Sequence, residues 1–96
     1  MRYFHRTTLS PDAVLKQADQ YFPGRAAPTE SGERHRVYAG TIGRISLRVF
    51  AEGGHYTLVN VETDQVGESE ADKVAKRFLT EVHQAADPSH VARGAY

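Results

Sequence analysis

Apolar residues recur along this chain with two different periods, and each period predicts one type of secondary structure. Two segments have the three-to-four-residue spacing of an amphipathic helix. Their apolar residues are Val14, Leu15, Ala18, Tyr21 and Phe22 in the first, and Ala71, Val74, Ala75, Phe78, Leu79, Val82 and Ala86 in the second. Each segment follows a serine, Ser10 or Ser69, which is a favoured N-cap residue. We therefore predict one helix near each end of the chain.

Four other segments are rich in alternating, β-branched or aromatic residues and predict strands at 2–9, 34–40, 44–51 and 56–63. Residues 23–33 hold prolines, glycines and small polar residues, which are typical of a surface loop. The expected fold is α+β with the order β-α-β-β-β-α, in which both helices pack on one face of a single four-stranded antiparallel sheet. This order is similar in topology to TATA-binding-protein-like domains and to a reduced helix-grip fold over residues 2–86, without a diagnostic motif. We expect one domain over 1–88 and a flexible tail over 89–96.

The turn between the last two strands decides which side chains share a face of the sheet. A two-residue turn, Gly53-Gly54, places Val49 beside Leu58, whereas a three-residue loop over 53–55 places Val49 beside Val59. The longer loop sorts apolar from polar residues better, and glycine suits its left-handed positions. We predict this register. It places six candidate binding residues on the face away from the helices: Arg44, Arg48, Phe50, Tyr56, Leu58 and Asn60.

The composition narrows the chemistry available to the chain. The 96 residues include no cysteine, which excludes disulfides, thiolate metal sites and cysteine nucleophiles and suits a reducing compartment. No apolar run reaches the roughly 18 residues that a membrane span needs, and the first residues do not read as a signal peptide, so we expect a cytoplasmic protein. The net charge is zero, but basic residues dominate the first half of the chain and acidic residues the second. This asymmetry is compatible with an electropositive face or with self-association.

No motif in the sequence predicts catalysis, a metal or a cofactor. The five histidines lie on different elements without ligand spacing. Nucleophile-elbow, phosphate-loop and dinucleotide-binding patterns do not occur. Ser46, His55, Tyr56 and Glu62 are candidate reactive groups around the last hairpin, but any such sheet offers similar choices. A non-catalytic protein therefore fits the sequence better than an enzyme.

Three functions remain open, in order of preference. The first is a small binding or assembly module that forms a homodimer through the exposed sheet face. The second is a small-ligand-binding or cyclase-like domain with a pocket between the sheet and the C-terminal helix. The third is a nucleic-acid-binding module that uses arginine and aromatic residues on the sheet, although the neutral net charge disfavours it. A larger protein partner is also compatible with the exposed face, and a membrane is not expected.

Overall fold

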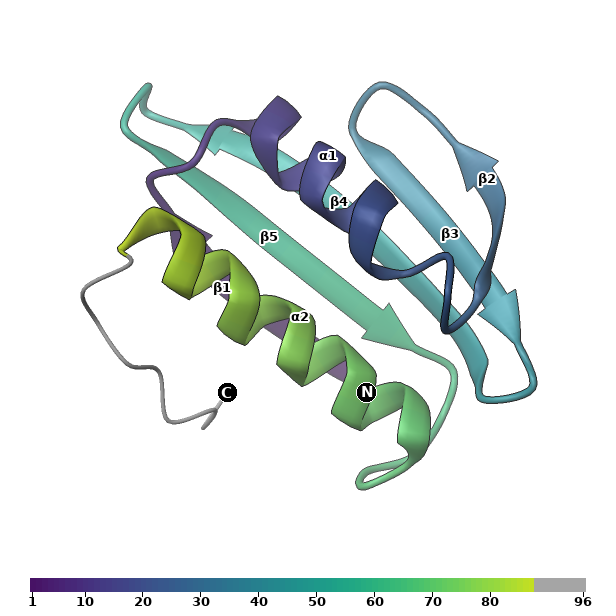
Figure 1. Cartoon of the computed structure of the whole chain (residues 1–96). Helices are drawn as coiled ribbons and strands as arrows, with labels where there is room; N and C mark the ends of the chain where they lie inside the picture. The colour runs from purple at the N-terminus through teal and green to yellow at the C-terminus, as the bar shows by residue number, and fades with distance from the viewer. Residues whose placement is uncertain (88–96) are drawn as a thin grey trace.

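A five-stranded antiparallel sheet carries two helices on one of its faces in the computed structural model, which describes residues 1–87 (Figure 1). The elements are β1 Arg2–Thr7, α1 Pro11–Tyr21, β2 Ala27–Ser31, β3 His35–Gly40, β4 Gly43–Glu52, β5 Tyr56–Thr63 and α2 Glu70–Ala86. The spatial order of the strands is β1-β5-β4-β3-β2, so the first strand pairs with the last. The predicted α+β class and the antiparallel sheet are confirmed. The tail predicted for 89–96, and residue 88 before it, lie outside the described residues.

The prediction of four strands was wrong, because the segment read as a loop contains β2. This strand pairs with β3, from Ala27 opposite Ala39 to Ser31 opposite Arg36, and its register shifts between Pro28 and Glu30. All its residues are exposed, so it shows no alternation of apolar and polar positions. Proline is tolerated there because β2 is an edge strand and its register shift lies next to Pro28, and sheets accommodate proline at edges and bulges. The observed order is therefore β-α-β-β-β-β-α.

The predicted three-residue loop between β4 and β5 is confirmed. Glu52 pairs with Tyr56, Val49 with Val59 and Leu47 with Val61. Gly53 and Gly54 have φ angles of 60° and 75°, which favour glycine because it has no Cβ. The loop therefore fixes which β4 and β5 residues face the helices.

Both helices begin at the predicted serines. The Ser10 Oγ accepts a hydrogen bond from the Ala13 N–H at 3.1 Å, and the Ser69 Oγ accepts one from the Asp72 N–H at 3.1 Å. Each bond satisfies one of the backbone donors that the first turn of a helix leaves unpaired. The caps therefore fix where each helix starts relative to the sheet.

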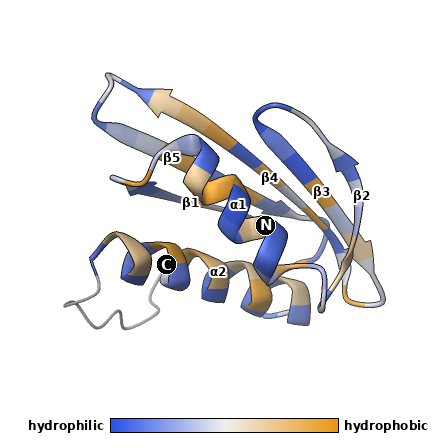
Figure 2. Cartoon of the chain, turned by 45° about the horizontal axis from the view of Figure 1, so that its top comes forward, coloured by the Kyte–Doolittle hydropathy of each residue, from blue (hydrophilic) through white to orange (hydrophobic). Residues whose placement is uncertain are grey.

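The core lies between the helices and one face of the sheet. In Figure 2 the two helices again lie on the same side of the sheet, and hydrophobic and hydrophilic bands alternate along α2. The side chains of Phe22, Tyr38, Phe78 and Leu79 are fully buried in this layer. The rings of Phe22 and Tyr38 stack with their centroids 4.6 Å apart. With the helices occupying one face, the other face of the sheet has no covering element of the described chain, and we call it the open face.

Candidate functional site

The open face carries all six residues that the sequence nominated for binding. Arg44, Arg48 and Phe50 lie on β4, and Tyr56, Leu58 and Asn60 lie on β5. The register places Arg48 opposite Asn60 and Phe50 opposite Leu58. Because side chains two positions apart on a strand share a face, these pairs form one continuous surface. Phe50 and Tyr56 are 45% and 53% exposed, which is unusual for large aromatic side chains.

Strand β1 adds residues to the open face that sequence reasoning missed. Phe4 lies opposite Asn60, and Arg6 lies opposite Leu58. Phe4 is 59% exposed. The alternation of Tyr3 and Thr7 with Phe4 and Arg6 is visible in the sequence. The sequence could not show that Phe4 and Arg6 lie on the open face, because their position there depends on the pairing of β1 with β5, which is distant in sequence.

Charges of both signs lie on the open face. The Arg6 Nε is 2.8 Å from Glu52 Oε1, and the Arg2 Nη2 is 3.0 Å from Glu62 Oε1. Such exposed ion pairs contribute about 0–1 kcal/mol each. Within residues 1–87, Arg48 makes no ion pair, so its guanidinium is available to another molecule.

Two hollows on the surface of the open face have Arg48 between them. One, of about 420 Å³, is lined by Arg44, Ser46 and Glu62 among others. The other, of about 340 Å³, is lined by Arg34, His35 and Phe50 among others. The first hollow contains acidic as well as basic side chains, so it does not form a simple anion site.

The space between the sheet and α2, where a ligand pocket was one alternative, is filled by side chains. Phe78, Leu79 and Val82 on α2 are fully buried. They meet Leu47 and Val61 from the sheet in the same core. Close packing of this kind leaves little room for a ligand without displacing core residues.

The candidate reactive groups around the last hairpin do not come together. Ser46 lies opposite Glu62, but Tyr56 lies six residues from Glu62 along β5, which is about 20 Å in a strand. His55 lies in the loop beyond Tyr56. A catalytic group would need these side chains within hydrogen-bonding distance of one another, so this arrangement does not form one.

Two histidines that the sequence assigned to separate elements are neighbours in space. The rings of His5 on β1 and His83 on α2 have centroids 5.5 Å apart. Burial and the neighbouring His83 lower the pKa of His5. Within residues 1–87 no three histidine or carboxylate side chains are grouped so that they could hold a metal ion.

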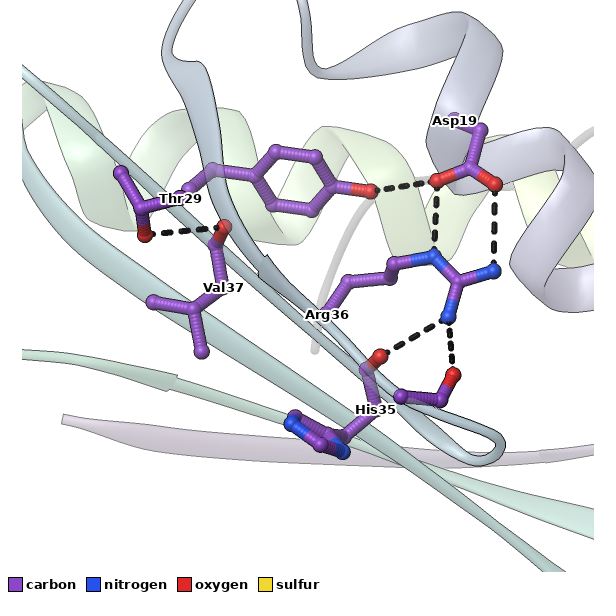
Figure 3. A network of polar contacts seen from close by, with 7 residues as sticks. Asp19, Thr29, His35, Arg36 and Val37 are labelled. Atoms are coloured by element: carbon purple, nitrogen blue, oxygen red, sulfur yellow. Dashed lines mark hydrogen bonds and ion pairs between the residues drawn. The ribbon is translucent and has the colours of Figure 1, made fainter.

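A polar network on the helix side holds α1 against β3 (Figure 3). Arg36 binds Asp19 through two contacts, Nε–Oδ1 at 2.9 Å and Nη2–Oδ2 at 3.3 Å. Its Nη1 donates to the carbonyl oxygens of Gly32 and His35, and the Tyr38 hydroxyl donates to Asp19 at 3.1 Å. Burial, together with the charge of Asp19, raises the pKa of Tyr38. Every group in this network is occupied within the chain, so its role is structural.

Replacing Arg36 by alanine is expected to lower the free energy of unfolding by about 1–2 kcal/mol, because hydrogen bonds to charged groups are lost and Asp19 loses its partner. Arg36→Lys should recover only part of the loss, since lysine cannot bind a carboxylate through two planar donors. Urea unfolding measures both. Arg34→Ala is the control, because within residues 1–87 the Arg34 side chain makes only an exposed 4.0 Å ion pair with Asp12 and should matter little.

Comparison with known proteins gives no relative: no family model, curated protein or solved structure matches the chain. Among the described residues, neither helix is long and apolar enough to cross a membrane. The open face is therefore the feature of the chain on which a proposed function rests.

Proposed function

We propose that this protein is a small non-catalytic assembly module that forms a homodimer through the open face. The observation that carries the proposal is the exposure of Phe4 and Phe50, at 59% and 45%, on a sheet face that neither helix covers. Leu58, which is half-buried, lies between their strands. An exposed apolar cluster rimmed by polar residues is typical of a protein interface.

The mixture of charges supports a second copy of this chain as the partner. An isologous interface covers a patch with the same patch, so it needs both signs of charge to complement itself. The open face meets this requirement, because Arg2, Arg6 and Arg48 lie among Glu52 and Glu62. A nucleic-acid surface is more uniformly basic, and this chain has a net charge of zero.

The size of the sheet also fits a dimer. Five strands about 4.8 Å apart, on average about seven residues long at about 3.3 Å per residue, give a face of about 550 Å² before side-chain relief is added. A standard interface buries about 800 Å² per partner. Burial of each large apolar side chain contributes at most about 1.5–3 kcal/mol, against an association cost of about 4–15 kcal/mol. We therefore expect a dimer of moderate affinity.

The lack of cysteine suits a reducing compartment, and we propose that the protein resides in one such as the cytoplasm.

Introducing an aspartate at Phe50 or Leu58 is expected to dissociate the dimer, because an unpaired carboxylate would be buried against the partner. Light scattering across a concentration series should give twice the chain mass for the native protein and the chain mass for each variant. Thermal unfolding of the variants should show an intact monomer.

Val66→Asp is the matched control, since Val66 is 92% exposed in the connection between β5 and α2. It should leave the dimer unchanged. A native protein that stays monomeric at high concentration would contradict the proposal. Salt-dependent binding of single-stranded nucleic acid, abolished by Arg48→Ala, would favour the nucleic-acid alternative instead.

A further inference from the structure

Two phenylalanines and two arginines alternate around the centre of the open face. At the level of Asn60, β1 carries Phe4 and β4 carries Arg48; at the level of Leu58, β1 carries Arg6 and β4 carries Phe50. The backbone positions of these four residues form a rectangle. Its side across the strands is about 10 Å, which is two strand spacings, and its side along the strands is about 7 Å, which is the rise of two residues. Residues of the same kind lie at diagonally opposite corners.

This alternation restricts how a second copy can lie on the face. A twofold axis in the plane of the interface, either along β5 or across the strands, exchanges neighbouring corners and brings each phenylalanine over an arginine. An axis along the diagonal that joins the two arginines brings each arginine over the same arginine of the partner subunit. An axis along the diagonal that joins the two phenylalanines leaves arginines of the two subunits beside one another. Like charges brought together at an interface are unfavourable, whereas a guanidinium over an aromatic ring is stabilising.

The remaining residues distinguish the two permitted axes. An axis along β5 brings Glu62 over Glu62 of the partner subunit and overlays only the three strands centred on β5. An axis across the strands, between the levels of Leu58 and Asn60, brings Glu62 over Tyr56 of the partner subunit and overlays all five strands. The second arrangement avoids a pair of like charges and buries more area.

We infer that the dimer has its twofold axis across the strands and that Arg48 of each subunit stacks on Phe50 of the partner subunit. This inference rests on the proposed self-association. Arg48 is suited to the role because it makes no ion pair within residues 1–87, so its guanidinium needs no release before binding. Arg6, which would lie over Phe4 of the partner subunit, is already held by Glu52 at 2.8 Å. Arg48 is therefore the residue that sets the register between the subunits.

A double-mutant cycle on the dimer dissociation constant tests this pairing. Arg48→Ala is combined with Phe50→Leu, which keeps apolar bulk but removes the ring, and separately with Phe4→Leu. One cation–π contact changes the constant roughly fivefold, so the two symmetric contacts should give a coupling of about 25-fold between Arg48 and Phe50. The effects of Arg48→Ala and Phe4→Leu should multiply without coupling. Sedimentation velocity gives the constants, and monomer melting curves correct for any coupling within one chain.

The outcomes separate this inference from the proposed function. A native monomer would overturn both. A native dimer in which Arg48 couples to neither phenylalanine would overturn the stacking and leave the assembly function standing. Coupling of Arg48 to Phe4 in place of Phe50 would overturn the inferred axis.

Discussion

Replacing Phe78 by alanine should lower the free energy of unfolding by about 3–5 kcal/mol, because it removes a buried ring and leaves a cavity. Phe78 is fully buried on α2, and its ring centroid lies 5.0 Å from that of Phe22 and 5.5 Å from that of Tyr21. The ring thus joins α2 to the end of α1. Small domains have about 5–15 kcal/mol of stability in total, so the variant should be marginally folded. In a thermal melt the midpoint should fall by at least about 12 °C.

Phe4→Ala is the matched control for Phe78→Ala. It removes the same atoms, but from a side chain that is 59% exposed, so it leaves no buried cavity. Measured at a concentration where the protein is monomeric, its melting temperature should change little. Equal losses for the two variants would mean that α2 does not pack on the sheet as described.

Replacing Asp72 by alanine is the second large expected loss, again about 3–5 kcal/mol. Asp72 is fully buried, and its carboxylate accepts hydrogen bonds from the hydroxyls of Tyr3 at 2.9 Å, Thr63 at 2.8 Å and Ser69. These bonds join β1, β5 and the start of α2 at one point. Alanine would remove this acceptor from the buried hydroxyls of Tyr3 and Thr63, and each unsatisfied buried group costs about 1–3 kcal/mol. Urea unfolding gives the difference directly.

Two controls show whether the loss comes from the buried network. Glu70→Ala removes an exposed carboxylate from the same helical turn, where the helix dipole accounts for about 0.3–1 kcal/mol. Asp72→Asn should cost less than Asp72→Ala, because its amide oxygen still accepts hydrogen bonds. If Glu70→Ala and Asp72→Ala were equally harmful, the network would not be the cause.

The same carboxylate makes stability depend on acid pH. Although burial raises the pKa of Asp72, the hydrogen bonds from Ser69, Thr63 and Tyr3 outweigh it and lower the pKa below the ordinary value. A group with a lowered pKa in the folded state stabilises the protein above its unfolded pKa of about 3.9, and this contribution disappears as pH falls through the folded pKa. Unfolding free energies measured below about pH 4 should fall more steeply for the native protein than for Asp72→Asn.

Most of the secondary structure was predictable because it depends on local physical chemistry. Ser10 and Ser69 cap helices through atoms three residues away, and the helical spacing marks the side of α2 that is buried. The pair Gly53-Gly54 and the alternation on either side of it favoured the observed register of β4 and β5 over a two-residue turn. Strand β2 was not predictable, because its residues are exposed and only pairing with β3 makes them a strand.

The sequence by itself determined which face of the last hairpin is turned away from the core, and hence that Arg48, Phe50 and Leu58 lie together. Only the tertiary structure decided what lies beside them. Phe4 completes the open face because β1 pairs with β5, and Asp72 meets Tyr3, 69 positions away, for the same reason. Local periodicity tells which residues of a strand share a face, but it does not tell which strand lies next to it. That choice depends on the packing of the whole chain, because strands distant in sequence become neighbours only when the helices and the sheet bury their apolar faces together.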